Sequence, residues 1–321
     1  MVLCAYHASQ EQFPPSALVR YARLAEQAGF TAVSSSEHLQ PWSPRQGQSG
    51  FAWAWLGAAM QATALPFGVV CAPGLRYHPM IIAQAAATLA ELFPGRFQVA
   101  LGSGEALNER VIGDPWPPKP ERHARLLECV DVIRALWAGE TVTHDGRVRI
   151  EGGRLYTRPA TPPRLFGAAV TAETARWVGR WADGLLTVGG PPEAVRQRLD
   201  AFREGGGTGK PVILQVALSY ARDEAEARQG AYEQWRTNIF PSDVLAELWT
   251  PKQFEAVARY VRAEDLESSV RISADPARHL AWLQQDVALG VSQVNLHNVN
   301  RGQEAFIDVF GTHVLPALQK A

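Results

Sequence analysis

Short apolar strand signals alternate with amphipathic helix signals along almost all of the 321 residues, and this alternation restricts the fold more than any other feature. Strands are expected at residues 2–7, 30–35, 67–72, 97–101, 165–170, 184–188, 212–220 and 291–296. Helices are expected at residues 15–28, 51–63, 79–92, 122–137, 173–182, 193–204 and 303–320. Eight such units on a chain of this length predict an α/β fold, a (β/α)8 TIM barrel, as one domain over residues 1–321.

Two stretches break the alternation and are expected as insertions into the barrel. Residues 139–163 carry short strand-like pieces at 148–150 and 155–156, which predict a small hairpin. Residues 222–270 form a helical excursion without a clear strand. The loops at 110–121 and 240–269 are expected to set substrate specificity, because loops at the mouth of a barrel usually do.

Charge and cysteine content exclude several classes of protein. The net charge is -1, which gives no electrostatic basis for binding nucleic acid or a membrane surface. Cys4, Cys71 and Cys129 are far apart and form no paired motif, so neither a disulfide framework nor a metal site is expected. This pattern fits a reducing, cytoplasmic environment.

No targeting or membrane-spanning segment is expected. The first residues have no basic region followed by an apolar run, as a signal peptide would. Residues 46–75 carry no charge, but Pro66 and Pro73 interrupt them, and a membrane span needs about 20 mainly apolar residues. We therefore expect a soluble protein.

The strand at 97–101 runs into a glycine turn and then into acidic and amide side chains. Gly102, Ser103 and Gly104 allow close approach of the backbone to a ligand, and Glu105 and Asn108 follow in the first turn of a helix. This order is typical of the mouth of an α/β enzyme. An ordinary strand-to-helix turn with a solvated acidic end is the alternative.

Polar side chains also follow other expected strands. They are His7 and Ser9, Glu37 and His38, Arg76, Tyr77 and His78, Thr171, and Asn295, His297 and Asn298. A single histidine after a strand is often structural. Several strands that end in titratable or amide groups favour a pocket at the C-terminal face of the barrel. A histidine and a carboxyl group in such a pocket suit proton transfer that accompanies hydride transfer.

An aromatic cluster in the second helix allows two interpretations. Phe51, Trp53 and Trp55 could form the wall of a cofactor site. Their position within a helix favours the hydrophobic core instead.

Three motifs together resemble the bacterial luciferase-like oxidoreductase superfamily. They are SEHLQPW at 36–42, FGVVCAPGLRYHP at 67–79 and GSGEALNE at 102–109, and HASQEQF at 7–13 and GRWADGLLTVGG at 179–190 extend the likeness. The chain is most similar to the branch of deazaflavin-dependent glucose-6-phosphate dehydrogenases, although the likeness weakens between residues 205 and 269. The resemblance implies a luciferase-like barrel, a flavin or deazaflavin at the C-terminal face, and a homodimer.

The resemblance also implies roles for single residues. His38 matches a proton-transferring histidine, and Glu105 matches the acid opposite it. The matches for cofactor binding are Glu37, Val70, Cys71, Ser103, Gly104, Asn108, Val170 and Thr171, and those for the substrate side are Trp42 and His7. A non-proline cis peptide that supports the cofactor ring is expected near Val70 and Cys71.

The chain departs from the branch in ways that bear on its ligands. Val170-Thr171 replaces a Gly-Gly pair that wraps the cofactor tail, and Gly190-Pro191 replaces a substrate-binding lysine. Arg271 lies close to the branch's arginine, and Lys252 near its second lysine. An anionic sugar phosphate without its lysines is poorly held. We predict that glucose 6-phosphate is not the substrate, and that FMN is the cofactor, with the 8-hydroxy-5-deazaflavin coenzyme as the alternative.

Three functions remain open at this point. The first is a flavin-dependent oxidoreductase or monooxygenase for a small organic substrate, with NAD(P)H or a separate flavin reductase as the source of electrons. The second is a deazaflavin-dependent dehydrogenase. The third is a flavin-binding protein without turnover, which the joint presence of His38 and Glu105 disfavours.

Overall fold

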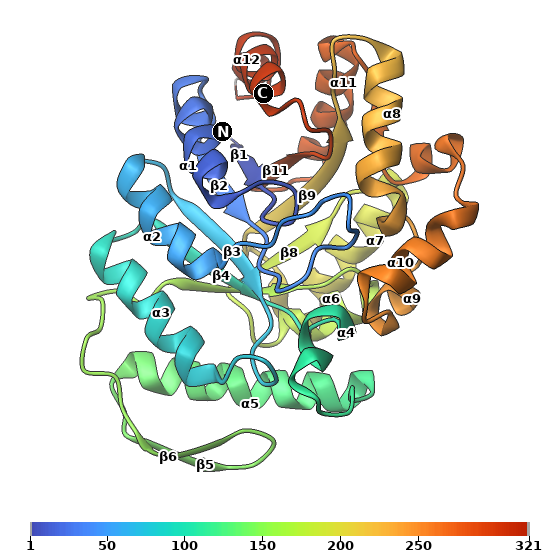
Figure 1. Cartoon of the computed structure of the whole chain (residues 1–321). Coiled ribbons are helices and arrows are strands. Elements are labelled where there is room, and N and C mark those ends of the chain that lie inside the picture. The colour runs from blue at the N-terminus through green and yellow to red at the C-terminus, as the bar shows by residue number, and fades with distance from the viewer. Residues whose placement is uncertain (1, 320–321) are drawn as a thin grey trace.

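The computed structural model describes residues 2–319, and eight parallel strands form a closed barrel at its centre (Figure 1). In chain order the strands are β1 (Leu3–Ala8), β2 (Ala32–Ser35), β3 (Phe67–Cys71), β4 (Phe97–Leu101), β7 (Arg164–Ala168), β8 (Gly184–Val188), β9 (Val212–Ser219) and β11 (Gln293–Asn298). Each pairs with the next, and β11 returns to β1. The predicted (β/α)8 barrel is confirmed.

Helices surround the barrel and bury one face each against the strands (Figure 1). The longer ones are α1 (Pro15–Gln27), α2 (Ala52–Ala62), α3 (Pro79–Leu92), α5 (Lys119–Ala138), α6 (Ala172–Gly179), α7 (Pro192–Phe202), α8 (Glu224–Trp235), α11 (Pro276–Val287) and α12 (Gln303–His313). Several start with proline, which is pre-set for the first helical position and has no amide hydrogen to leave unpaired there.

Short helices complete the chain. They are α4 (Ala106–Glu109), η1 (Arg110–Ile112), η2 (Arg203–Gly207), η3 (Arg236–Asn238), α9 (Ser242–Glu247), α10 (Pro251–Val257), η4 (Ala258–Tyr260), η5 (Ala263–Ser268) and α13 (Leu315–Leu318). The expected helical excursion is present as α8 to η5, which lies together on one side of the barrel (Figure 1). It ends in β10 (Arg271–Ile272), a short strand beside β9 that the sequence analysis did not anticipate.

The insertion after α5 is a hairpin, as expected, but its second strand lies earlier than predicted. β5 (Val142–Asp145) pairs with β6 (Arg149–Gly153) in antiparallel fashion, and the hairpin extends beside α5 (Figure 1). The predicted strand at 155–156 is wrong: Leu155 is not in a strand, and Tyr156 is 91% exposed. Apolar residues there produced a strand signal without a partner to pair with.

Several predicted elements agree with the structure to within a few residues. The helix at 79–92 and the strand at 184–188 match to the residue. The predicted closing helix at 303–320 is divided into α12 and α13, and its last residue, Lys320, lies outside the described residues. Trp53 and Trp55 are buried in the core, which confirms the core interpretation of those two residues. None of the described helices has the length and apolar character needed to cross a membrane.

Candidate active site

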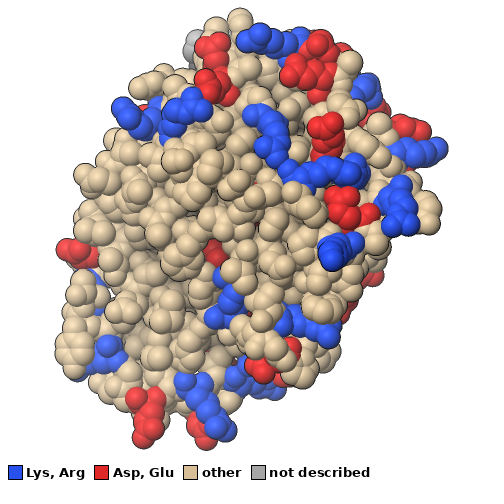
Figure 2. All heavy atoms as spheres, in the orientation of Figure 1, with Lys and Arg blue, Asp and Glu red and all other residues tan. Residues whose placement is uncertain are grey.

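A cavity of about 1460 Å³ opens at the C-terminal ends of the barrel strands. Figure 2 shows that charged side chains lie mostly towards the rim of the face drawn there, with a small group of charged atoms in a hollow near its centre. All twelve residues predicted for the site line the cavity: His7, Glu37, His38, Trp42, Val70, Cys71, Ser103, Gly104, Glu105, Asn108, Val170 and Thr171. The barrel therefore brings together residues that are up to 164 positions apart in sequence, from 7 to 171.

His38 lies beside a carboxylate that was not among the residues expected in the site. Its Nδ1 atom lies 3.1 Å from Oε1 of Glu11, in the loop after β1. Both residues line the cavity. Because Nδ1 faces Glu11, Nε2 is the ring nitrogen that is turned away from the carboxylate and is free to meet a substrate. An imidazole beside a carboxylate is a common arrangement for accepting a proton.

Glu11 is held as an anion by its donors. Oε2 accepts hydrogen bonds of 2.8 Å each from the hydroxyls of Ser9 and Ser36. Burial would raise the pKa of Glu11, but the nearby His38, a backbone hydrogen bond and the two hydroxyls together lower it below its ordinary value. Glu11 can therefore stabilise positive charge that develops on His38.

Glu105 lines the same cavity, but its pKa is shifted in the opposite direction to that of Glu11. It stands just before α4, and its Oε2 atom is buried without a hydrogen-bond partner among the described residues. Burial raises the pKa of Glu105 to about 7; His38 opposes this shift and Glu11 adds to it. A carboxyl group with this pKa can both release and take up a proton near neutrality.

A buried ionic cluster formed by Glu37, Arg76 and Glu109 also borders the cavity. Arg76 donates to Glu37 at 2.6 Å, and Tyr77 donates its hydroxyl to the same carboxylate at 2.8 Å. The amide of Arg76 also donates to Glu109 at 2.9 Å. Burial raises the pKa of Glu109 to about 7, against the opposing effect of the bonds to Arg76. The side chain of Glu37 is thus already held by two donors within the protein.

The glycine turn fits closely against its surroundings. Gly104 has a positive φ of 81°, and a Cβ atom there would lie 2.8 Å from Cγ of Glu109. Only glycine meets both conditions without strain. Asn108 binds the loop that carries His38: its Oδ1 atom accepts a hydrogen bond of 2.9 Å from the amide of Leu39. The turn and α4 therefore fix the position of the His38 loop.

Neutral histidines form another part of the wall. The rings of His7 and His297 have centroids 4.5 Å apart, and Trp235 meets His297 edge-on. Burial lowers the pKa of His7 to about 4 and that of His297 well below its ordinary value. Gln12 lies 3.0 Å from Nε2 of His297, and Ser34 lies 2.9 Å from Nδ1 of His7. These groups supply polar contacts without charge.

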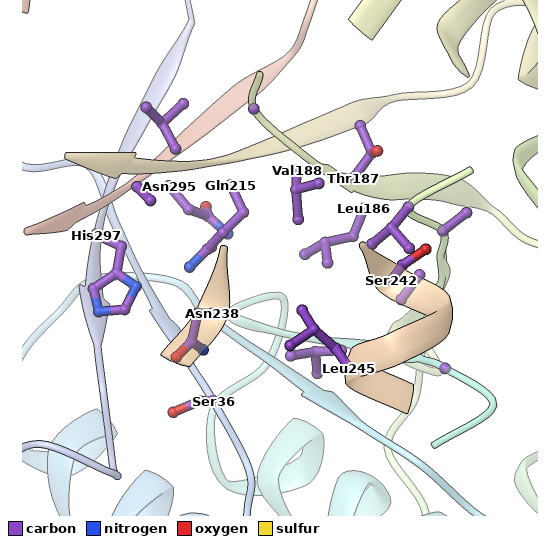
Figure 3. A pocket seen from close by; sticks show the side chains of 18 of the residues that line it. Ser36, Leu186, Thr187, Val188, Gln215, Asn238, Ser242, Leu245, Asn295 and His297 are labelled. Carbon is purple, nitrogen blue, oxygen red and sulfur yellow. The ribbon is translucent and has the colours of Figure 1, made fainter. Parts of the chain in front are cut away.

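The wall next to His38 is apolar. Trp42 packs edge-on against both His38 and Phe254 of α10, with centroid distances of 5.1 and 5.2 Å. Phe254 is fully buried in the small cluster that also contains Trp42. Figure 3 shows Asn238, Ser242 and Leu245 facing the ends of β8 and β9 across the cavity. These residues offer hydrocarbon and neutral polar groups, while the charged side chains of Asp243 and Glu247 from the same excursion also line the cavity.

The substrate-binding cations of the related branch are missing or occupied here. Gly190 and Pro191 line the cavity where a lysine was expected in that branch. Arg271 lines it too, but the Arg271 guanidinium forms two hydrogen bonds to the buried carboxylate of Asp286, one of them 2.8 Å long. Lys252 is exposed and is not among the lining residues.

One expectation at the cofactor positions is wrong. No cis peptide bond occurs in residues 2–319, so the expected one near Val70 and Cys71 is absent. Both residues instead continue the parallel ladder of β3, paired with Ala100 and Leu101 of β4. Regular pairing of this kind uses trans peptides throughout.

The cavity suits a flavin-type coenzyme together with a small substrate. Pockets for small molecules commonly measure about 300–1,000 Å³, and this one is larger. The unpartnered Oε2 of Glu105 and the tight glycine turn both border it. Within residues 2–319, no group of three or more His, Cys, Asp and Glu side chains is arranged to hold a metal ion.

Sequence reasoning missed Glu11 and did not place Glu109 in the site. Glu11 is the third residue of the loop that follows β1, and its position within the HASQEQF stretch was the one available signal. Glu109 is the last residue of α4 and, like Glu105 just before that helix, lines the cavity. The sequence alone could not show that these two side chains reach the cavity, because this depends on how the loops fold over the C-terminal end of the barrel.

Comparison with known proteins agrees with this geometry. Residues 1–293 match the family described as luciferase-like monooxygenase. The chain belongs to this family. Its members and close relatives are oxidoreductases, and the chain is an enzyme of that class.

Two relatives are similar over nearly the full length. F420-dependent glucose-6-phosphate dehydrogenase of Beutenbergia cavernae is 36% identical, over 99% of this chain and 98% of that protein. The protein of the same description from Microbacterium testaceum is 34% identical, over 98% and 97%. An F420-dependent secondary alcohol dehydrogenase, solved with an F420–acetone adduct, is 29% identical with a TM-score of 0.91, and 99% of each chain is covered.

Proposed function

We propose that this enzyme uses the deazaflavin coenzyme F420 to interconvert a small neutral alcohol and its ketone or aldehyde by hydride transfer. The support for F420 is the full-length similarity to relatives described as F420-dependent. These relatives favour the deazaflavin alternative over FMN, although the sequence analysis preferred FMN. The pair His38 and Glu11 beside an apolar wall is the observation that carries the choice of an alcohol.

The reaction needs one group that takes a proton and one that takes a hydride. When bound at the cavity, beside residues such as Ser103, Gly104 and Asn108, the coenzyme would supply the hydride acceptor. His38 accepts the hydroxyl proton at Nε2, and Glu11 stabilises the resulting positive ring through the contact at Nδ1. The alcohol loses one hydride and one proton and becomes the carbonyl compound, and the reverse reaction returns both.

Glu105 completes the proton path in this proposal. With a pKa of about 7, its carboxyl group can hold the proton that leaves His38 or pass it to solvent. Its unpartnered oxygen is available for this exchange. Trp42 and Leu245 exclude water around the reacting carbon, since both are apolar and line the cavity.

A neutral substrate fits the charges better than a sugar phosphate. Arg271 is already paired with Asp286, and Gly190-Pro191 offers no cation. Without the lysines of the related branch, a phosphate monoester in this part of the cavity would lose hydration with less compensation. The sequence-based prediction against glucose 6-phosphate is retained in the proposal.

The direct test combines coenzyme binding with a substrate panel. Purified apo-protein is titrated with F420 and, separately, with FMN, while tryptophan fluorescence is followed. F420-loaded enzyme is then mixed with 2-propanol, cyclohexanol and glucose 6-phosphate, and reduction of the coenzyme is recorded. We expect F420 binding and reduction by the neutral alcohols only. Tight binding of FMN alone, or reduction only by glucose 6-phosphate, would overturn the proposal.

A further inference from the structure

The cavity does not end at the mouth of the barrel but continues between the strands. Its lining includes Gly68 and Gln98, the second residues of β3 and β4, and Gln293, the first residue of β11. Gln215 of β9 and Asn295 of β11 line it as well. We call the part lined by these five residues the interior shaft. The interior of a TIM barrel is usually filled by layers of bulky side chains, but eight strands also leave room for one small ligand.

Small residues keep the interior shaft open on the side of β3 and β4. Val69 and Val99 pack into the hydrophobic core, so the alternating strand pattern turns Gly68 and Ala100 inward. Both of these small residues line the cavity. A Cβ atom at Gly68 would lie 3.4 Å from Cγ of Gln98. A larger side chain at position 68 would therefore enter the space beside Gln98.

The polar side chains of the interior shaft have unused hydrogen-bonding groups. Nε2 of Gln293 donates to Oδ1 of Asn295 at 2.7 Å, which leaves Oε1 of Gln293 and Nδ2 of Asn295 without a partner among the described residues. These two residues are only 4% and 1% exposed. The half-buried side chains of Gln98 and Gln215 form no hydrogen bond within residues 2–319. Burying amides in this state is costly unless a ligand or water completes their hydrogen bonds.

Apolar side chains line the cavity next to the interior shaft. A small buried cluster, with Leu186 packed against it, consists of Ala100, Phe166 and Ile213. In Figure 3, Asn295 and Gln215, which are register partners on β11 and β9, lie together on one side of the view and Leu186 on the other. A molecule in the shaft would therefore meet amide groups and hydrocarbon at the same time.

The interior shaft offers no charge to a ligand. Its five defining residues are one glycine and four amides, and the carboxyl groups of Glu11 and Glu105 stand in the loops after β1 and β4. A carboxylate, phosphate or ammonium group in the shaft would lose its hydration without an opposite charge. An uncharged group that both donates and accepts hydrogen bonds, such as a hydroxyl or a carboxamide, would satisfy the free amides instead.

The interior shaft extends well away from the reacting groups. His297 stands four residues after Gln293 on β11, which corresponds to about 13 Å along the strand. Because barrel strands are tilted, the depth along the barrel axis is on the order of 10 Å. Nε2 of His297 lies 3.0 Å from Oε1 of Gln12, the neighbour of Glu11. A substrate that meets His38 would therefore need a chain to reach the amides.

We propose that the interior shaft binds an uncharged polar group at the far end of the substrate, a hydroxyl or a carboxamide joined to the carbinol carbon by a chain. The inference rests on the proposed function and narrows its substrate class. Gln98 and Gln293 exchange hydrogen bonds with this group, and Leu186 contacts the chain. Ser103 and Gly104, which are expected to bind the coenzyme, follow the C-terminal end of β4 and leave the shaft free.

The first test measures binding without turnover. Hexanamide, hexanoate and hexylamine, which is a cation at neutral pH, are titrated into wild type and Gln98→Leu by calorimetry. Wild type should bind hexanamide about tenfold or more tightly than either charged compound. Gln98→Leu should weaken hexanamide binding about fivefold or more, because a free amide is lost. Gln197→Leu, at an exposed position of α7, is the matched control and should change nothing.

Two further measurements separate recognition from folding. Gln98→Leu removes an unsatisfied amide, so its midpoint of thermal unfolding should not fall, whereas a structural role for Gln98 would lower it. Gly68→Val keeps all four amides but fills the space beside Gln98, so it should also weaken hexanamide binding. If Gln98→Leu does not fold, Gly68→Val and Gln293→Leu provide the same test.

Kinetics then test the link to the substrate. Coenzyme-loaded enzyme is compared on 2-heptanol and on 1,6-heptanediol, which is the same secondary alcohol with a hydroxyl at the far end. Wild type should oxidise the secondary carbinol of the diol with a kcat/KM about tenfold higher than that for 2-heptanol. Gln98→Leu should reduce this ratio to below about twofold, and Gln197→Leu should keep the wild-type ratio.

The outcomes separate this inference from the proposed function. Selective hexanamide binding that is lost in Gln98→Leu, without turnover of any alcohol, would support the shaft as a binding site and contradict the proposed oxidation. Equal binding of the amide and the charged compounds, or no effect of the shaft variants, would overturn the shaft while alcohol turnover keeps the proposed function. Absence of both hexanamide binding and alcohol turnover would overturn both.

Discussion

Glu11 and Glu105 line the same cavity from the loops after β1 and β4, but the protein shifts their pKa values in opposite directions. Glu11 accepts two hydroxyl hydrogen bonds and contacts His38, and its pKa lies below the ordinary value. Glu105 has one oxygen buried without a partner, and its pKa is raised to about 7. Burial acts on both carboxylates in the same direction, so the supply of donors decides which one stays charged.

This contrast divides the proton chemistry between two groups. Glu11, with its lowered pKa, can orient and stabilise His38 as an anion, whereas an acid that titrates near neutrality can exchange protons with solvent. Three substitutions test the division.

The largest effect is expected for Glu11→Gln. Removing the anion beside His38 should lower kcat/KM for the alcohol about 10²- to 10³-fold, because general base catalysis typically contributes 10²- to 10⁴-fold. Coenzyme affinity should stay within about threefold, since Gln keeps the shape and can still accept from Ser9 or Ser36. Steady-state kinetics and fluorescence titration measure both quantities, and an unchanged kcat/KM would remove Glu11 from the proposed role.

Glu105→Gln should have a smaller effect on rate and a clear effect on pH dependence. We expect alcohol oxidation by wild type to rise as pH increases through about 7, where Glu105 ionises, and this limb should be missing in the variant. Turnover at pH 8 should fall about ten- to a hundredfold. A variant that retains the limb would show that another group titrates there.

Glu105→Gln should also raise the free energy of unfolding at alkaline pH. In the unfolded chain Glu105 ionises near 4.5, and in the folded chain near 7. The folded state therefore holds the proton more tightly, and stability is lost as pH rises from 4.5 to about 7. Glu105→Gln avoids this cost and should be more stable by up to about 3 kcal/mol at pH 8, with little gain at pH 4. Urea unfolding at the two pH values measures the difference.

Ser36→Ala should have the smallest effect. It removes one donor to Glu11 and should lower the free energy of unfolding at pH 7 by about 1–2 kcal/mol. Since the folded pKa of Glu11 is depressed, this part of the stability is present above the unfolded pKa and disappears as pH falls through the folded one. Ser36 also accepts from the amide of Gln10, a bond that does not titrate. A loss that is the same at pH 3 and pH 7 would assign the effect to Gln10 instead.

Strand periodicity was sufficient to predict the barrel and to place His38 and Glu105 near each other. Residues directly after parallel strands meet at one end of a barrel whatever the loops do. Glu11 follows β1 by three residues, as His38 follows β2, but its contact with His38 depends on a hydrogen bond from Ser36 that no local pattern encodes. The pairing of Arg271 with Asp286 likewise depends on how β10 and α11 pack together.

The misplaced hairpin strand and the unforeseen β10 have a common cause. β10 has only two residues, and its pairing with β9 comes from the position that the preceding excursion gives it. The apolar residues at 155–156 have the side-chain pattern of a strand but no neighbouring edge. In both cases tertiary context, and not intrinsic preference, decides whether a segment pairs.

The contact of Phe254 with Trp42 has a consequence for how such an enzyme can diversify. The helical excursion supports the wall beside His38 through this aromatic pair, while its residues that line the cavity, such as Asn238, Ser242 and Leu245, face the ends of β8 and β9. New specificities can therefore arise by exchanging residues such as Asn238, Ser242 and Leu245 while the proton-transfer groups on the first four strands are inherited unchanged. A grafted excursion from a relative should remain compatible with the chemistry as long as an aromatic ring is retained at position 254.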